Sequence, residues 1–160
     1  MVLENVQALI NHVRQLIAIQ EVLKEISNST SSNEKKLILS QYKEDENLQQ
    51  IIKYTYDPNI NFGENVQENI INLSETDTLD DVYPLWYMLD KLAKNNNDKL
   101  MQQEFRDYMG FFPDINYLIT SIITKDLKLG LSITSINKIF PNLNLISDNN
   151  NSKIIQLFNN

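Results

Sequence analysis

The sequence predicts an all-α fold: a compact single domain built as a bundle of about six to eight helices. Apolar residues recur at three- and four-residue steps through most of the chain, which is the period of a buried helix face. The 160 residues include only 3 Gly and 4 Pro, too few for the many turns of an all-β fold. A chain of this length fits one domain and can bury roughly 70% of the surface of its unfolded state.

The first helix is predicted over residues 6–26, and it has the clearest apolar stripe in the chain. Its members are Val6, Leu9, Ile10, Val13, Leu16, Ile17, Leu23 and Ile26. We expect this stripe to cover the domain's own core; pairing with another chain is the alternative. The serine-rich segment 27–32 ends the helix, and Ser31 followed by Glu34 has the spacing of a capping box.

Two more helices follow in the first half of the chain. One carries the apolar residues 37–39, and the next carries Leu48, Ile51 and Ile52 behind Asp45, a candidate N-cap. Asp57-Pro58 signals a turn. Residues 59–73 are ambiguous between a loop and a short helix.

Four helices are predicted in the second half of the chain. Residues 79–92 form one, with Pro84 in its first two turns, where proline costs least. Residues 100–109 form another, and Gly110 suits its left-handed C-terminal cap.

A helix is next expected from Pro113 to Leu127, and Gly130 is in place to close it. Ser132 then caps a last short helix, which Pro141 stops. The chain is therefore divided into an additional N-terminal helix (1–19) packed on the domain, a helical domain (20–145) and a polar C-terminal tail (146–160).

Composition excludes several classes of site. The chain has no Cys and a single His, His12, which excludes disulfides, thiolate metal sites and metal sites built from several histidines. Phosphate-binding glycine motifs are missing, and no apolar run reaches the roughly 18 residues of a membrane span. We expect no cofactor, no metal, no membrane partner and a cytoplasmic location. The net charge of −7 requires that any DNA-binding lysines be concentrated locally.

The most informative stretch is residues 125–141, Lys-Asp-Leu-Lys-Leu-Gly-Leu-Ser-Ile-Thr-Ser-Ile-Asn-Lys-Ile-Phe-Pro. It predicts a helix, a tight turn at Gly130 and a second helix, whose free N–H groups favour anions. Lys125, Lys128 and Lys138 against Asp126 make it about +2 in an acidic chain. The alternative is structural, because a glycine C-cap followed by a serine N-cap is a common helix corner.

This stretch resembles the end of the N-terminal DNA-binding domain of bacteriophage-type ATP-dependent DNA ligases. In that family a basic–acidic–Leu–x–x–Gly–x–Ser corner leads into a short helix that ends near an aromatic-Pro pair. Residues 23–26, 35–39 and 47–56 resemble the opening helices of the same domain, in the family's order and at similar spacing. Together the two matches bracket roughly residues 20–145.

The resemblance implies an all-α domain that grips duplex DNA, including nicked duplex, through backbone phosphates and without sequence readout. It also implies a viral (phage) protein of DNA replication or repair, working in the host cell cytoplasm. Carried over onto this chain, with the neighbouring lysines added, the DNA-binding residues are Lys125, Lys128, Gly130, Ser132, Thr134, Ser135 and Lys138, with Lys35 and Lys36 as a weaker second face.

Three departures from the family shape the functional prediction. Residues 1–19 are additional, the chain is more acidic than a DNA-gripping domain, and the adenylation domain is missing. No lysine is followed by x-Asp-Gly, the motif whose lysine attacks ATP in the family, so we expect no enzyme activity from this chain alone. The alternative function is an acidic helical module that binds a protein partner and has kept the fold without DNA binding.

Other residues have two interpretations each. Residues 44–46 and the pair Asp80-Asp81 could be paired catalytic or metal-binding carboxylates, but acids are favoured in the first turn of a helix. The aromatic side chains of Tyr83, Trp86 and Tyr87 could stack on bases; their helical spacing favours a core role. His12 is expected on a partly buried helix surface without an obvious partner.

Overall fold

The computed structural model describes residues 6–63 and 83–145. Within these ranges the chain forms seven α-helices and no strand, which confirms the predicted all-α fold class. The elements are α1 (Val6–Asn28), α2 (Ser32–Gln41), α3 (Glu46–Tyr56), α5 (Leu85–Lys94), α6 (Lys99–Gly110), α7 (Asn116–Ile123) and α8 (Ile133–Ile139), with two 3-10 turns, η1 (Pro113–Ile115) and η2 (Pro141–Leu143).

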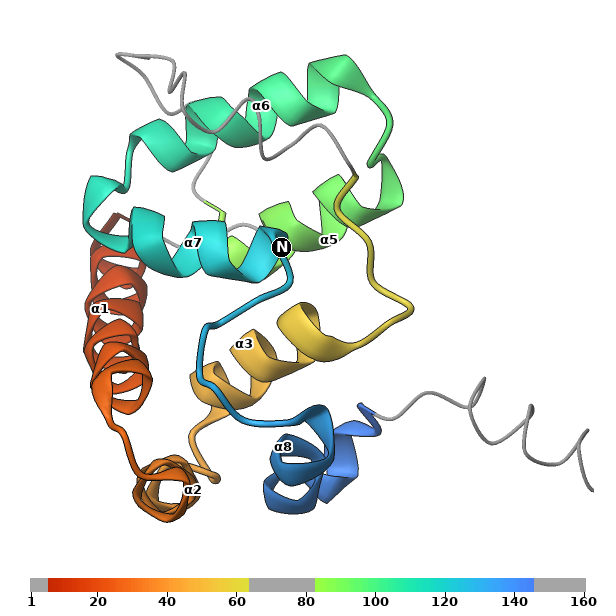
Figure 1. The fold of residues 1–160 in the computed structure, drawn as a ribbon. Coiled ribbons are helices and arrows are strands. Elements are labelled where there is room, and N and C mark those ends of the chain that lie inside the picture. The colour runs from red at the N-terminus through yellow and green to blue at the C-terminus, as the bar shows by residue number, and fades with distance from the viewer. Residues whose placement is uncertain (1–5, 64–82, 146–160) are drawn as a thin grey trace, which may run out of the picture.

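The helices surround one apolar core, with α3 near its centre (Figure 1). α3 packs against both α7 and α1, while α5 and α6 pair on one side of it. At the other end of the molecule α2 packs against α8. Residues from α2 and from the α7–α8 segment therefore lie side by side, although about 90 positions separate them in the sequence.

Helix starts follow the predicted caps. Ser31, Asp45 and Ser132 each accept a hydrogen bond from the backbone N–H three residues later, at 2.9–3.2 Å. Each bond satisfies one of the N–H groups that a helix start leaves without a partner. Asp98, which the sequence did not single out, caps α6 in the same way.

Three predicted helix ends differ from the observed ones. α7 ends at Ile123, so Gly130 does not close it. The closing left-handed residue is Lys125, with φ 64°, and the N–H of Asp126 donates to the carbonyl of Ser121 at 3.0 Å. This is the hydrogen-bond pattern of a Schellman motif, usually closed by glycine. Gly110 ends α6 without a positive φ, and Pro84 precedes α5 rather than lying inside it.

The predicted boundary between residues 19 and 20 lies inside α1, which is one continuous helix. Its buried residue Gln20 joins it to the second half of the chain. The Gln20 Nε2 donates to the Asp114 carbonyl at 2.8 Å, and its Oε1 accepts the Leu118 N–H at 2.9 Å. The predicted tail 146–160 lies outside the described residues.

His12 has a partner that the sequence did not reveal. Its Nε2 accepts the N–H of Leu85 at 3.3 Å, at the start of α5, and its ring meets the edge of Trp86 with 5.7 Å between centroids. A neutral imidazole can accept this bond, whereas a protonated one would place a positive charge at the positive end of the α5 dipole. Burial lowers the pKa of His12 below its ordinary value of 6.5.

We expect stability to depend on the protonation of His12. Because its pKa is lower in the folded state, the folded protein binds fewer protons than the unfolded one, so the free energy of unfolding falls as pH drops from 6.5 through the folded pKa. Urea unfolding, followed by the fluorescence of the single tryptophan, measures this between pH 7.5 and 5. His12→Phe keeps an aromatic ring beside Trp86 but cannot be protonated, so its free energy of unfolding should depend less on pH. An equal slope against pH in the parent and the variant would contradict a role of His12 protonation.

Candidate nucleic-acid interface

The fold brings the two lysine-bearing segments predicted from the sequence onto one surface. The ammonium of Lys35, on α2, donates to the carbonyl of Leu129 at 2.8 Å. Ser27, at the end of α1, donates its hydroxyl to the carbonyl of Lys128 at 2.8 Å. These two bonds fix the connection between α7 and α8 against the α1–α2 corner (Figure 1).

Residues 126–132 of this connection form neither a helix nor a strand, and the predicted tight turn at Gly130 is not formed. Leu127 and Leu129 are buried, while Asp126, Lys128 and Gly130 alternate with them and are exposed. Because Leu127 and Leu129 are buried in the core, Asp126, Lys128 and Gly130 form the solvent-exposed side of the connection.

Two left-handed residues shape the exposed side. Lys128 has φ 57°, and its N–H donates to the Asp126 carboxylate at 2.8 Å. Gly130 has φ 69°, and a Cβ at this position would lie 2.6 Å from the Lys35 ammonium. Glycine therefore lets the Lys35 side chain reach the backbone of the connection.

Lys125 faces the interior. Its ammonium donates to the carbonyls of Tyr54, Asp57 and Ile60 at 2.8–2.9 Å, at the C-terminal end of α3. Burial lowers its pKa to about 8, and the Asp57 carboxylate opposes that shift. All three donors are engaged, so we leave Lys125 out of the proposed DNA-binding surface.

The remaining predicted residues lie on α8. The Ser132 hydroxyl caps the helix and donates to the Ser135 hydroxyl at 3.0 Å. Thr134 and Lys138 are exposed, Lys138 in the last turn. α8 therefore offers one exposed hydroxyl and one ammonium toward solvent, while its two serines stabilise its start.

Two residues beside this surface were not selected from the sequence. The ring of Tyr117, on α7, has the Lys24 ammonium 5.0 Å and the Lys128 ammonium 5.9 Å from its centroid. Lys24 lies on α1, so the three side chains come from three separate elements. No local spacing relates them, and only the tertiary fold reveals the cluster.

The carboxylates and aromatic residues for which the sequence left two interpretations open are mostly engaged in structural contacts. Asp45 caps α3, and Asp80-Asp81 lies outside the described residues. Trp86 stacks on Tyr54 at 5.7 Å, and Tyr83 stacks on Tyr87 at 4.4 Å, all partly or fully buried against the core. Within residues 6–63 and 83–145, no three His, Cys, Asp or Glu residues gather as metal ligands.

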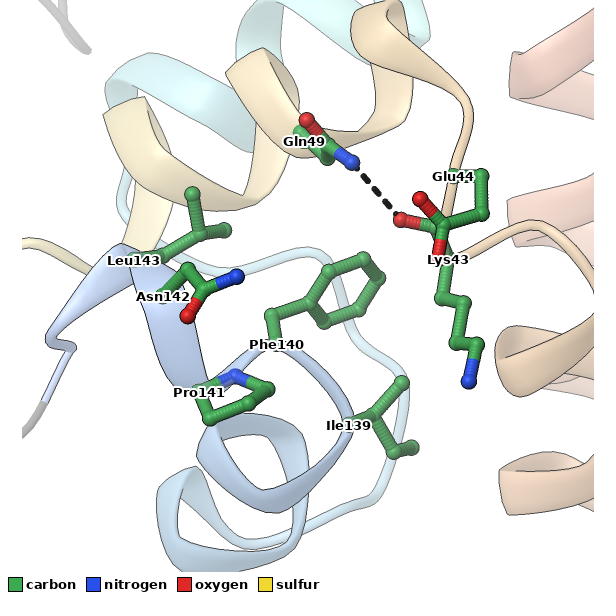
Figure 2. Close-up of a pocket in the computed structure, with 8 residues that line it drawn as sticks. All are labelled: Lys43, Glu44, Gln49, Ile139, Phe140, Pro141, Asn142 and Leu143. Carbon is green, nitrogen blue, oxygen red and sulfur yellow. Dashed lines mark hydrogen bonds between the residues drawn. The ribbon is translucent and has the colours of Figure 1, made fainter.

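A small cavity of about 210 Å³ opens between the α2–α3 turn and the end of α8 (Figure 2). The ring of Phe140 points toward that turn, where Gln49 Nε2 donates to the Lys43 carbonyl at 2.8 Å. None of the residues predicted to bind DNA lines the cavity. It is therefore separate from the lysine-bearing surface.

No protein-family model matches the chain, and a search of curated proteins finds no match either. None of the helices in the described ranges is long and apolar enough to cross a membrane.

Proposed function

We propose that the chain is a non-catalytic module that binds duplex DNA, including nicked duplex, through its phosphate backbone and without sequence readout. One observation carries the proposal: the Lys35–Leu129 bond joins the two segments that resemble the DNA-contacting parts of a ligase domain. The proposed surface is the exposed side of the connection together with α2 and α8, and we call it the lysine surface. It contains Lys36, Lys128, Gly130, Thr134 and Lys138.

The charges on this surface are available to phosphates. Lys36, Lys128 and Lys138 form no ion pair within the part of the chain that the structure describes. The nearby exposed acids in sequence are Glu34 and Asp126, and Asp126 is engaged by the Lys128 N–H. Such local segregation of positive charge is what phosphate binding requires of a chain with net charge −7.

Reversing two lysines of this surface tests the proposal. We expect Lys36→Glu with Lys138→Glu to weaken binding to a labelled duplex at least about tenfold at low salt, equally for unrelated sequences. The salt dependence of the affinity should also flatten, because fewer counterions are released. Fluorescence anisotropy from low to moderate salt measures both effects.

Lys99→Glu with Lys94→Glu is the matched control. It changes the net charge by the same amount at exposed positions on α5 and α6, which lie away from α2 and α8. Its affinity should stay within about threefold of the parent protein. Equal losses in both double variants would show a general charge effect and contradict a local DNA-binding surface.

A specific observation favours a second candidate, a protein-interaction module. Val6 and Ile10, at the start of α1, are 61% and 39% exposed and line an apolar groove of about 440 Å³ with Phe111. Arg14 and Asp114 also line it, and opposite charges around one groove suit a second copy of the chain related by a twofold axis. A dimer in sedimentation, combined with no duplex binding at low salt, would favour this candidate.

A further inference from the structure

We infer that Lys24, Tyr117 and Lys128 form a second phosphate-binding position, which extends the lysine surface from the connection onto α1 and α7. This inference rests on the proposed function, because it assigns further residues to the same bound duplex. The cluster has three independent properties that suit a phosphate: converging ammonium groups, an unfilled groove and hydrogen-bond donors beside it.

Two ammonium groups converge on one aromatic ring. Lys24 and Lys128 lie 5.0 and 5.9 Å from the centroid of Tyr117, within the distance at which a ring attracts a cation. Two positive charges therefore lie near one ring, and an anion bound beside the ring would be attracted by both. Lys24 has one ion-pair partner, Glu21, at 3.6 Å on the exposed side of α1, where such a pair stabilises little.

A shallow groove of about 210 Å³ opens beside Tyr117 on the side of Lys128, and Lys24 does not line it. It is lined by Tyr117 and Lys128 together with Asn116, Thr120, Ser121 and Thr124 of the α7 segment. The lining combines an ammonium with hydroxyl and amide groups. A phosphate oxygen accepts hydrogen bonds from all three kinds of donor.

The hydroxyl and amide groups of the groove differ in whether they already have a hydrogen-bond partner. Ser121 and Thr124 donate to carbonyls one turn earlier, both at 2.8 Å. Thr120 makes no such bond among the described residues, so its hydroxyl can donate into the groove. The side-chain oxygen of Asn116 is buried without a partner; a 180° rotation of this amide exchanges that acceptor for a donor.

The cluster is continuous with the lysine surface through Lys128. The carbonyl of Lys128 is held by Ser27 on α1, and the next carbonyl is held by Lys35 on α2. In the view of Figure 1 the connection passes across one end of α3 on its way from α7 to α8. Lys128 therefore belongs both to the lysine surface and to the cluster with Tyr117 and Lys24, so one bound DNA strand would contact both.

Charge changes at Lys24 test the inference. Lys24→Glu should weaken duplex binding about tenfold at low salt and lower the slope of log affinity against log salt by about one. Glu21→Gln frees Lys24 from its ion pair and should raise affinity about twofold. Thr120→Val, which removes one hydroxyl and keeps the side-chain volume, should weaken binding about threefold.

Controls separate this inference from the proposed function on which it rests. Thermal unfolding of each variant confirms that it is folded, and Lys99→Glu supplies the effect of net charge alone. If the parent protein binds duplex and Lys24→Glu behaves like Lys99→Glu, the second position is wrong while the proposed function stands. If the parent protein binds no duplex at low salt, both are wrong.

Discussion

Replacing Gly63 by alanine should destabilise the fold by about 3 kcal/mol or more. Gly63 has φ 94°, and a Cβ there would lie 2.3 Å from the backbone oxygen of Asn96. A left-handed conformation costs an alanine roughly 1–2 kcal/mol, and overpacking against a rigid neighbour costs roughly 1–3 kcal/mol more. Because the obstructing atom belongs to the backbone, no side-chain rotation can relieve the contact.

The surroundings of Gly63 make a compensating shift expensive. Its N–H donates to the Asn61 side chain at 2.9 Å, and Asn96 Nδ2 donates to the Asn61 carbonyl at 3.1 Å. The Asn96 carbonyl also accepts Nε2 of the buried residue Gln102 at 2.9 Å. Moving Asn96 away from a new methyl group would weaken this network, which ties the end of the first described segment to the α5–α6 turn.

Urea unfolding measures the effect of Gly63→Ala, and Gly110→Ala is its matched control. Gly110 is the last residue of α6 and has no positive φ, so alanine there should be neutral or stabilising by up to about 1 kcal/mol. A Gly63→Ala protein within about 0.5 kcal/mol of its parent would contradict the tight contact with Asn96.

Lys125→Met should destabilise the protein by about 3 kcal/mol. Methionine keeps an apolar chain of similar length but removes the ammonium that binds three carbonyls at the end of α3. A hydrogen bond to a charged group contributes about 1.5–3 kcal/mol, and a buried carbonyl left without a donor costs about 1–3 kcal/mol. The expected loss is smaller than the sum over three carbonyls, because the neighbouring backbone can relax and water can enter to bind the carbonyls that lose their donor.

Lys128→Met is the comparison that distinguishes the structural role of Lys125 from the proposed DNA-binding role of Lys128. Lys128 also has a left-handed φ, 57°, but its ammonium forms no hydrogen bond or ion pair with the residues that the structure describes and lies 5.9 Å from the centroid of the Tyr117 ring. We expect Lys128→Met to change stability by less than about 0.5 kcal/mol and to weaken duplex binding. Folded Lys125→Met, measured well below its unfolding midpoint, should bind duplex as its parent does; the reverse pattern would contradict the assignment of the two lysines.

Much of the fold could be predicted because its signals are local. Ser31, Asp45 and Ser132 cap their helices as predicted, since a cap depends on residues three positions apart. The end of α7 could not be predicted in this way. Its apolar spacing continues to Leu127, but Lys125 adopts a left-handed conformation, and its ammonium binds carbonyls of Tyr54 in α3 and of residues just after α3, some 65–71 positions away.

For the candidate site, too, the sequence identified the separate segments, whereas the contacts between them depend on the tertiary fold. The resemblance identified residues 35–36 and 128–138 separately, and only the fold shows that Lys35 touches the Leu129 carbonyl. Charge counting treats Lys125 and Lys128 alike, although Lys125 is half-buried and bound to three carbonyls whereas Lys128 is exposed. Tyr117 and Lys24 carried no sequence signal as a pair, because their contact depends on how α1 packs against α7.

Salt-titrated anisotropy of the unmodified protein with nicked and intact duplexes of two unrelated sequences tests the central claim most directly. We expect binding at low salt, equal affinity for the two sequences, and a linear fall of log affinity with log salt as lysine–phosphate contacts release counterions. Absence of binding to every duplex at the lowest salt would contradict the claim that the lysine surface binds DNA.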